Sequence, residues 1–370
     1  MQSLNVVSLF DGISCGRVAL EKTGYAVSSY IAYEIDKYAK AVSRYNYSDI
    51  VQLGDVLDAD FSKFSGYDMV MGGSPCTFWS IAKSSGREVD KDGKGWALFM
   101  RFVDAVRQVK PRYFLYENVA SMPSNIKDYI SEELGCAPIL INSALVSAQS
   151  RKRLYWTNIE GISQPYDKGI LLQDVLEIPG LTVRDKSHCI DASYYKGGNS
   201  NLHKQSGKRL MVYKPIAITD KSQTILSTMH KENALSMVKR QKMGLFVAEE
   251  ATEQVISAPV RIGSIGNGGQ GDRIYSVRGK TVSLMANGGG RGAKTGLYRI
   301  DLPDGDYHVR KLTPKEAERC QTLPDNYTAF GVDDEGKTVK TSNTQRYKAI
   351  GNGWTVDVIT HILSHIPKGR

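Results

Sequence analysis

Two motifs at the ends of predicted strands contain residue types that nucleophilic and acid-base chemistry require. The first is Gly72-Gly73-Ser74-Pro75-Cys76, which follows an apolar run. A cysteine on a Gly/Pro-rich loop beside a strand end is exposed enough to react as a nucleophile through its thiolate. Because a lone cysteine is usually a small core residue, a structural role for Cys76 stays open at this point.

The second motif is Glu117-Asn118-Val119, directly after a predicted strand that ends at Tyr116. A carboxyl group at a strand end that faces a cleft can be kept protonated by burial and can donate a hydrogen bond. The alternative is a surface acid on a loop.

Farther along, Arg151 and Arg153 alternate, so both are expected on one side of a strand. Guanidinium groups aimed inward need anions or carbonyl groups as partners, whereas an exposed basic strand is the alternative.

Two turns and one strand end contain residues that could bind a ligand. Phe10-Asp11-Gly12-Ile13-Ser14-Cys15-Gly16 follows the first apolar run, and its glycines let main-chain amides approach a ligand. The motif is not GxGxxG, so a dinucleotide fingerprint is not supported. Glu34 ends the second predicted strand, where a carboxylate can accept hydrogen bonds from a ribose. Asp55, in Gly54-Asp55-Val56, can accept a hydrogen bond from an exocyclic amine or can cap a helix. A purely structural turn and a solvated strand end are the alternatives for the first two.

Alternating strands and helices over the first ~160 residues must position these groups. Within Trp96–Val109, apolar residues recur at i, i+3, i+4 and i+7, the stripe of an amphipathic helix. The pattern predicts a doubly wound, mainly parallel α/β sheet that binds ligands beyond the carboxyl ends of its strands. The predicted strands are Asn5–Phe10, Tyr30–Glu34, Met69–Gly72, Phe114–Tyr116 and Ile139–Val146, and the other early helices are Gly16–Lys22 and Lys37–Tyr45.

From about residue 165 to 305 the pattern changes to Gly, Ser, Lys and Asn with short β-like runs. Residues 255–300 hold seven basic residues against one acid, and Asn-Gly-Gly occurs twice, a sign of tight hairpin turns. Helical patterns return at Thr313–Leu323 and, after a Gly-Asn-Gly turn, at Val356–Ile366. The chain therefore reads as an α/β domain interrupted by a β-rich insertion.

Composition narrows the class of protein. With 370 residues, 24% of them charged and 41% hydrophobic, the chain is an ordinary globular protein of about two domains. No apolar run approaches the ~20 residues of a membrane span, and the N-terminus lacks a basic signal region, so we expect a cytoplasmic protein. Its five scattered cysteines fit reduced thiols, and no metal site is predicted. A net charge of +9 permits a polyanionic partner without proving one.

Taken in order, the motifs resemble those of the DNA cytosine-C5 methyltransferase family. The set is FDGISCG, Glu34, GDV, GGSPC, ENV and QSRKR, followed by Arg310–Glu316 (RKLTPKE) and Gly351-Asn352-Gly353. The resemblance covers roughly residues 1–160 and 309–366, and GGSPC, ENV and Trp354 are most similar to the phage and prophage branch and to the vertebrate de novo enzymes. It implies a Rossmann-like class I methyltransferase domain over 1–170 and 338–370, with a smaller β-rich target-recognition domain over 171–337.

The resemblance also implies that S-adenosylmethionine is the methyl donor and binds the first half of the sheet. Its methionine end would lie against Phe10, Asp11, Gly12 and Gly16. The remaining cofactor residues implied are Glu34 at the ribose, Ile35, Asp55 and Val56 at the adenine, Leu98 at the start of the fifth motif, and Asn352 and Trp354 on the C-terminal side.

For the reaction, the resemblance implies that Cys76 adds to C6 of a cytosine and that C5 then receives the methyl group. Glu117 would stabilise the charge that builds on the ring, Arg153 would bond the carbonyl oxygen O2, and Arg151 would support the site. The target atom is inaccessible inside a duplex, so the nucleotide must be flipped out. The loop Ser80–Gly95 follows the nucleophile and is expected to close over the DNA.

The implied partner is double-stranded DNA with a short specific sequence, methylated by a monomer of bacterial or phage origin that is associated with the nucleoid while it acts. A cognate restriction endonuclease on another chain is compatible with this origin. The candidates for reading bases or contacting phosphates are Arg261, Arg273, Arg278 and Arg291.

Alternatives to this function remain at this stage. One is an RNA cytosine methyltransferase of the same fold that acts on tRNA, although the long basic middle region favours duplex DNA. Another is an inactive DNA-binding partner, which would lack Cys76 or Glu117, and a third is a nicotinamide-dependent oxidoreductase.

Two positions depart from many bacterial relatives: Thr77 stands where they have a glutamine that fills the gap left by the flipped base, and Trp354 stands where they have a small residue.

Overall fold

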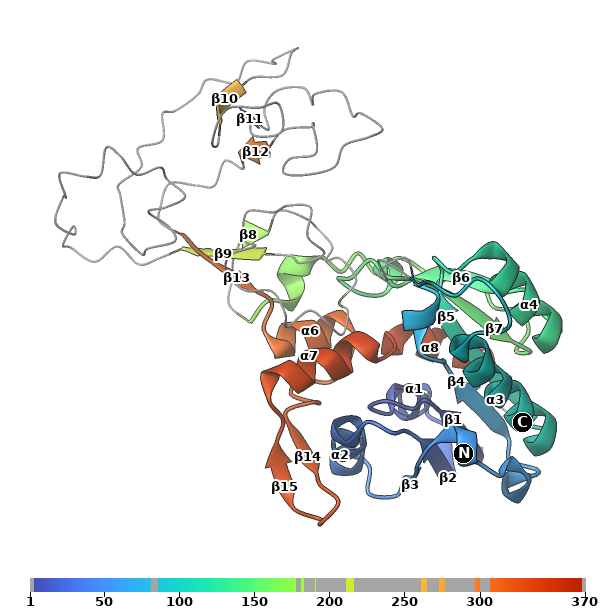
Figure 1. Ribbon diagram of the computed structural model, residues 1–370. Coiled ribbons are helices and arrows are strands. Elements are labelled where there is room, and N and C mark those ends of the chain that lie inside the picture. Colours follow the sequence, from blue (N-terminus) through green and yellow to red (C-terminus); the bar gives the residue numbers. More distant parts are fainter. Residues whose placement is uncertain are drawn as a thin grey trace.

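The computed structural model (Figure 1) describes residues 3–80, 86–177 and 307–367, together with the short segments 181–182, 190, 211–215, 261–264, 273–276 and 297–299. The three long ranges together form one α/β unit around a single seven-stranded sheet. The short segments lie in the middle part of the chain.

A seven-stranded sheet with the order β3-β2-β1-β4-β5-β7-β6 forms the centre of this unit. The first five strands in that order are parallel, whereas β7 runs antiparallel to both β5 and β6. The predicted doubly wound, mainly parallel sheet is therefore confirmed. The strands are β1 (Ser3–Leu9), β2 (Ala26–Tyr33), β3 (Val51–Leu53), β4 (Met69–Gly72), β5 (Tyr113–Val119), β6 (Ile139–Asn142) and β7 (Lys152–Thr157), and the helices between them are α1 (Cys15–Thr23), α2 (Lys37–Asn46), α3 (Lys94–Val109) and α4 (Ser124–Leu134).

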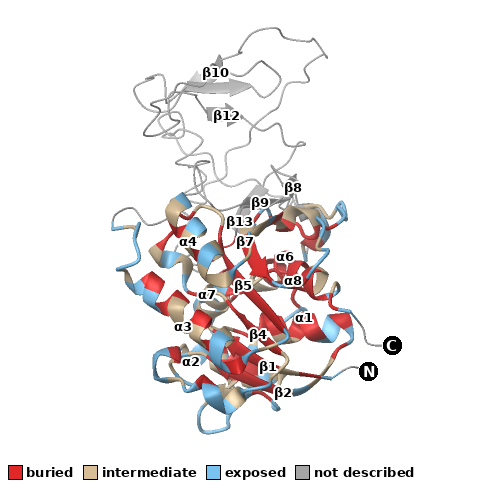
Figure 2. Cartoon of the chain, turned by 90° about the vertical axis from the view of Figure 1, so that its right-hand side faces the viewer, coloured by how far each residue is buried: buried red, intermediate tan, exposed pale blue. Residues whose placement is uncertain are grey.

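Helices cover both faces of the sheet, which is why its strands are buried (Figure 2). The alternation along β1 shows how the sequence divides between the faces. Leu4 and Val6 pack in the cluster that contains α1 and the final helix α8 (Val356–Leu363). Val7 and Leu9 pack in the opposite cluster with the apolar stripe of α3. α1 ends at Gly24, which adopts a left-handed φ of 77° that favours glycine.

The C-terminal segment returns to this unit. α6 (Pro314–Cys320) begins with a capping box between Thr313 and Glu316, and α7 (Asn343–Asn352) follows a hairpin of β14 (Phe330–Val332) and β15 (Thr338–Lys340). The hairpin packs on α2 so closely that a side chain at Gly331 would lie 2.9 Å from Cβ of Ala41. Leu323 and Tyr327 belong to the cluster of α1 and α8. The hairpin, which spans the predicted domain boundary at residue 337, therefore packs on the α/β unit, and the boundary itself stays a prediction.

Four details of the sequence analysis need correction. The strand predicted over Ile139–Val146 ends at Asn142, because the Asn142 side chain accepts a hydrogen bond from the N–H of Ala144 and starts a 3₁₀ turn. The helix predicted over Thr313–Leu323 stops at Cys320. Gly351-Asn352-Gly353 is the C-terminal end of α7 rather than a separate turn. Arg151 precedes β7, so it does not share a strand face with Arg153.

In the middle region, all the described segments longer than a single residue are strands. β10 (Arg261–Ser264), β11 (Arg273–Ser276) and β12 (Leu297–Arg299) form one small sheet, and β8 (Leu181–Thr182), β9 (Met211–Pro215) and β13 (Tyr307–Lys311) form another. Arg261 and Arg273 thus lie on neighbouring antiparallel strands. Arg278, Arg291 and both Asn-Gly-Gly turns lie outside the described residues.

Replacing the buried Glu318 on α6 should destabilise the fold. Its carboxylate pairs with Arg346 at 2.8 Å and accepts hydrogen bonds from the N–H groups of Asn326 and Thr328. Glu318→Ala leaves these donors without their acceptor, so we expect the free energy of unfolding to fall by about 3–5 kcal/mol in urea denaturation. Glu335→Ala, at an exposed position in the β14–β15 turn, is the control and should change it by less than about 0.5 kcal/mol. Equal stability of the two variants would contradict the importance of this ion pair.

Candidate active site

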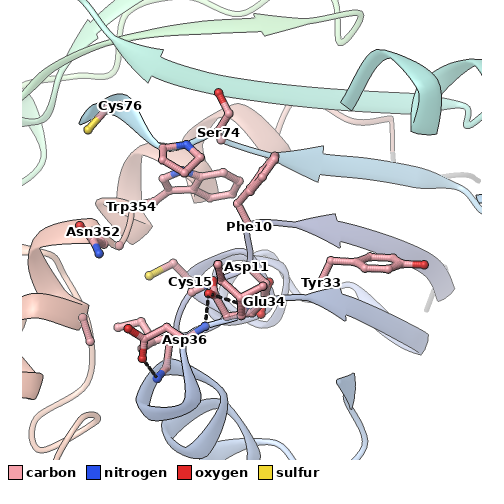
Figure 3. A pocket seen from close by; sticks show the side chains of 18 of the residues that line it. Phe10, Asp11, Cys15, Tyr33, Glu34, Asp36, Ser74, Cys76, Asn352 and Trp354 are labelled. Carbon is pink, nitrogen blue, oxygen red and sulfur yellow. Dashed lines mark hydrogen bonds between the residues drawn. The ribbon is translucent and has the colours of Figure 1, made fainter. Parts of the chain in front are cut away.

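A cavity of about 300 Å³ lies beyond the carboxyl ends of β1, β2, β4 and β5. Figure 3 shows Cys76 and Ser74 after β4, Phe10 and Asp11 after β1, Glu34 after β2, and Trp354 and Asn352 entering from the end of α7. All fifteen predicted catalytic and cofactor residues line this one cavity: Phe10, Asp11, Gly12, Gly16, Glu34, Ile35, Asp55, Val56, Cys76, Leu98, Glu117, Arg151, Arg153, Asn352 and Trp354. The sheet therefore brings together groups that are up to 344 positions apart in the sequence (354 − 10).

The turn after β1 is held in an unusual conformation by its neighbours. Phe10, Gly12 and Ser14 have φ values of 55°, 60° and 60°, a region that is costly for the two residues other than glycine. The N–H of Gly12 donates to Oε2 of Glu34 at 2.8 Å, while Oε1 of Glu34 accepts from the N–H groups of Ile35 and Asp36. Three main-chain donors thus fix the Glu34 carboxylate at the cavity wall.

Asp11 has a perturbed acidity. Burial raises the pKa of its carboxyl group to about 6, although hydrogen bonds from the hydroxyl groups of Ser14, Ser8 and Tyr30 lower it. The nearby Glu34 carboxylate also raises this pKa. Asp11 is therefore mostly ionised at pH 7, and a modest fall in pH protonates it.

Asp55 and Ile35 add a polar and an apolar group to the lining of the cavity. Asp55 caps the 3₁₀ helix Val56–Asp58 by accepting from the N–H of Leu57 at 3.0 Å, so the capping interpretation is confirmed while the residue also lines the cavity. Ile35 is 70% exposed although it is a large aliphatic residue. An exposed apolar side chain beside a carboxylate suits a flat ligand with polar edges.

The loop that carries Cys76 is tied to β5 by a buried network. The hydroxyl groups of Ser74 and Tyr116 are 2.6 Å apart, and Nδ2 of Asn118 donates to the main-chain oxygen of Ser74 at 3.2 Å and to Tyr116 Oη at 3.1 Å. Cys76 itself begins a 3₁₀ turn, Cys76–Phe78, and is partly exposed. The thiol thus stands on a rigid support at the cavity.

Glu117 is held between two side chains in the same cavity. Its Oε1 lies 2.9 Å from Nε of Arg153, and its Oε2 accepts from the indole N–H of Trp354 at 3.1 Å. The carboxylate is nearly buried, with the side chain 10% exposed, and the Arg153 side chain is 13% exposed. The surface interpretations of Glu117 and Arg153 are therefore wrong.

Arg151 has a different task from Arg153. Its guanidinium donates to the main-chain oxygens of Gly351 and Gly353 at the end of α7, each at 3.1 Å, and to that of Ile190 at 3.1 Å. Both arginines thus have partners of the predicted kind, which are carbonyl groups for Arg151 and a carboxylate for Arg153.

Sequence reasoning missed several groups at the cavity. Asp36, which caps α2, is bonded to Lys348 of α7 at 2.5 Å, and both residues line the cavity. Burial raises the pKa of Asp36, but the Lys348 ammonium and two main-chain N–H groups outweigh it and lower that pKa below its usual value. These two residues are 312 positions apart, so only the folded chain pairs them. An Asp before a helical pattern could have been recognised as a cap, whereas Lys348 gave no signal.

The described residues contain no cluster of three metal-ligating side chains. Within the same part of the chain, no helix has the length and apolar character needed to cross a bilayer.

Arg87, from the loop after Cys76, donates to the main-chain oxygens of Trp79 and Ser121. Residues 81–85 of that loop lie outside the described residues.

Gly73 provides a test of how tightly the loop and the acid fit together. A methyl group at this position would lie 2.9 Å from both the main-chain oxygen and Oε2 of Glu117. We expect Gly73→Ala to displace the loop or the carboxylate and to lower the activity of this site by roughly tenfold or more. Gly54→Ala adds a methyl group elsewhere on the cavity wall, where no atom lies within 4 Å, and should leave the melting temperature of the ligand-free protein unchanged. An alanine at position 73 with wild-type activity and melting temperature would contradict this packing.

Comparisons with known proteins indicate one family. The model of the C-5 cytosine-specific DNA methylase family matches residues 4–368. The type II methyltransferase M.HhaI of Haemophilus parahaemolyticus is 27% identical over 99% of this chain and 95% of its own. The orphan methyltransferase M.SPRI of Bacillus phage SPR is 24% identical over 99% of this chain and 98% of its own.

Among solved structures, the Entamoeba histolytica methyltransferase EhMeth has the same fold, with a TM-score of 0.59 at 13% identity over 99% of this chain and 98% of that one. The chain belongs to the C-5 cytosine-specific DNA methylase family, and it is an enzyme that transfers a methyl group from S-adenosylmethionine to C5 of cytosine in DNA.

Proposed function

We propose that the cavity holds S-adenosylmethionine along β1 and β2 and the flipped cytosine between Cys76, Glu117 and Arg153. The observation that carries this proposal is that a thiol, a carboxylate and a guanidinium line one cavity, with the carboxylate bonded to the guanidinium. The rest of the cavity is lined by carboxylates and apolar side chains, which suit a second, larger ligand.

The cofactor fits these walls by chemistry. Glu34 retains acceptor capacity for ribose hydroxyl groups, because a carboxylate has about four lone-pair sites and the main chain uses three. The exposed Ile35 and the nearby Val56 offer an apolar surface to adenine, and Asp55 can accept from its amino group. Asp11 offers negative charge to the methionine end. When bound, S-adenosylmethionine supplies a methyl group on a positively charged sulfur.

Cys76 acts as the nucleophile in this proposal. Its thiolate, the reactive form, forms a bond to C6 of the cytosine, and the ring electrons shift so that C5 can attack a methyl group. When the C5 proton is later removed by a base, the bond between sulfur and C6 breaks and the thiolate is restored. The rigid contacts of Ser74 with Tyr116 and Asn118 hold the loop in place for this attack.

Glu117 and Arg153 act on the opposite edge of the base. Glu117, protonated or sharing a proton with N3, stabilises the negative charge that builds on the ring, and Arg153 donates to O2. Trp354 and Arg153 hold the carboxylate from both sides, so it needs little reorganisation when a base enters. Arg151 supports the site through the end of α7.

Duplex DNA has to deliver the target base. Flipping costs a few kcal/mol, which phosphate contacts and the closed pocket must offset. We assign target recognition to residues 171–337, with Arg261, Arg273, Arg278 and Arg291 as candidates for base or phosphate contacts and the loop after Cys76 as a cover. A monomer acting at a short specific sequence, with or without a separate nuclease, fits this assignment.

The affinity for S-adenosylmethionine should depend on pH through Asp11. With a pKa of about 6, its carboxylate is negative above pH 6 and neutral below it, while the ammonium and sulfonium groups of the cofactor stay positive. We therefore expect calorimetry to give a Kd that rises about tenfold from pH 7 to pH 5. Asp11→Asn should remove most of this dependence, whereas Asp58→Asn, at an exposed position nearby, should keep it. An unchanged pH profile in Asp11→Asn would argue against this contact.

Cys76→Ala tests the covalent mechanism directly. Bisulfite sequencing of the expression plasmid should show protected cytosines in one short context with the wild-type protein and none with Cys76→Ala, a loss of more than about 10³-fold. Binding of duplex DNA and of S-adenosylmethionine should persist in the variant. Cys136→Ala, a partly buried cysteine away from the cavity, is the matched control and should methylate normally. Substantial turnover by Cys76→Ala would refute the mechanism, and transfer to tRNA but not to DNA would favour the RNA alternative.

A further inference from the structure

Ile190 is buried beside the C-terminal helices, although it belongs to the middle part of the chain. It is fully buried in a cluster with Leu312, Tyr347 and Ile350. Its N–H donates to Oε1 of Gln149 at 2.5 Å, and its carbonyl oxygen accepts from Nη1 of Arg151 at 3.1 Å. Ile190 is thus seated by its side chain and by both of its main-chain polar groups.

The two side chains that hold Ile190 also hold the end of α7. Arg151 donates to the carbonyl oxygens of Gly351 and Gly353, each at 3.1 Å. Gln149 donates to Oε1 of Gln321 at 3.0 Å, and Gln321 donates to the carbonyl oxygen of Gly353 at 3.2 Å. Gln149 and Gln321 are fully buried and Arg151 is 5% exposed. A buried network of this kind has few alternative arrangements, because a displaced partner leaves polar groups without water or protein to bond.

One residue separates this network from the reacting groups. Trp354 follows Gly353 and donates its indole N–H to Oε2 of Glu117 at 3.1 Å. The other carboxylate oxygen of Glu117 pairs with Arg153 at 2.9 Å. Direct contacts therefore lead from Ile190 through Arg151 and the end of α7 to Trp354 and the carboxylate.

We infer that the burial and hydrogen bonds of Ile190 set the position of Trp354 and, through it, of Glu117. Ile190, Gln149 and Gln321 are then positioning residues for methyl transfer, although none of them lines the cavity. Ile190 falls within the residues that we assign to target recognition. Its contacts with Gln149, Arg151 and the surrounding apolar cluster therefore connect that region to Glu117. The inference rests on the role proposed above for Glu117.

Truncation of Ile190 tests the link against a control of equal burial. Ile190→Ala removes three carbon atoms from its cluster, and we expect kcat for methyl transfer to fall about tenfold because Trp354 and Glu117 lose their alignment. Ile130→Ala truncates an equally buried isoleucine of α4 in the cluster that contains α3, and should cost similar stability with kcat near the wild-type value. Equal kcat values for the two variants at a temperature where both are folded would overturn the inference.

A double-mutant cycle identifies the route. Trp354→Phe removes the N–H donor to Glu117. If Ile190→Ala lowers kcat only because it displaces Trp354, it should lower kcat little further in a protein that already carries Trp354→Phe. We expect kcat of Ile190→Ala/Trp354→Phe to lie within about twofold of the slower single variant. Losses that multiply would mean that Ile190 acts independently of Trp354 and would overturn the link.

If Ile190→Ala fails to fold, Ile190→Val and Gln149→Met provide the same cycle with smaller changes in packing. The proposed function is judged separately, because turnover by Cys76→Ala would refute it whatever the Ile190 variants do. Conversely, an inactive Cys76→Ala together with multiplying losses would retain the function and remove only the link to Ile190.

Discussion

The C-terminal end of α7 depends on a buried positive charge. The last carbonyl groups of a helix have no partner within it, and here those of Ile350 and Gly351, together with that of Gly353, receive side-chain donors from Gln321 and Arg151. The negative end of the helix dipole favours a guanidinium at this position. A buried guanidinium is costly without such partners, and unpaired carbonyl groups cost about 1–3 kcal/mol each, so each side of the contact requires the other. This mutual requirement joins β7, α6 and α7 and fixes the residue that follows, Trp354.

From that contact the active site assembles as two rigid halves. One half is the loop of Cys76, held against β5 by Ser74, Tyr116 and Asn118. The other half is Trp354 at the end of α7, and Glu117 lies where they meet. Gly73 lets them approach, since any side chain there would touch the Glu117 carboxylate. Catalysis by positioning demands this precision, because misplacing a reacting group by about 1 Å can cost a hundredfold in rate.

The part of the cavity that follows β1 and β2 is built differently. Its two carboxylates are held by groups from the first two strands and the turns that follow them: Glu34 by the N–H groups of Gly12, Ile35 and Asp36, and Asp11 by the hydroxyl groups of Ser8, Ser14 and Tyr30. Local contacts of this kind form as soon as β1 and β2 pair. Cys76 follows β4 and Glu117 lies on β5, whereas the contacts that support Glu117 through Trp354 need residues after 310. The contacts of Glu34 and Asp11 therefore come from the first half of the chain, whereas those of Glu117 come from both halves. The second half also reaches the cavity through Lys348, Asn352 and Trp354.

The sequence alone determined the main alternation of strands and helices, the mainly parallel sheet and, through the family resemblance, the groups at its carboxyl edge, whereas β3, α4 and the β14–β15 hairpin were not predicted. It could do so because hydrophobic periodicity and glycine turns are local properties, and because parallel strands bring their carboxyl ends to one edge. Only the tertiary structure decided that Arg151 caps α7 while Arg153 pairs with Glu117, and that Lys348 bonds Asp36 across 312 residues. Partner choice among buried polar groups depends on which of them the packed core leaves within about 3 Å, and no local pattern records that distance.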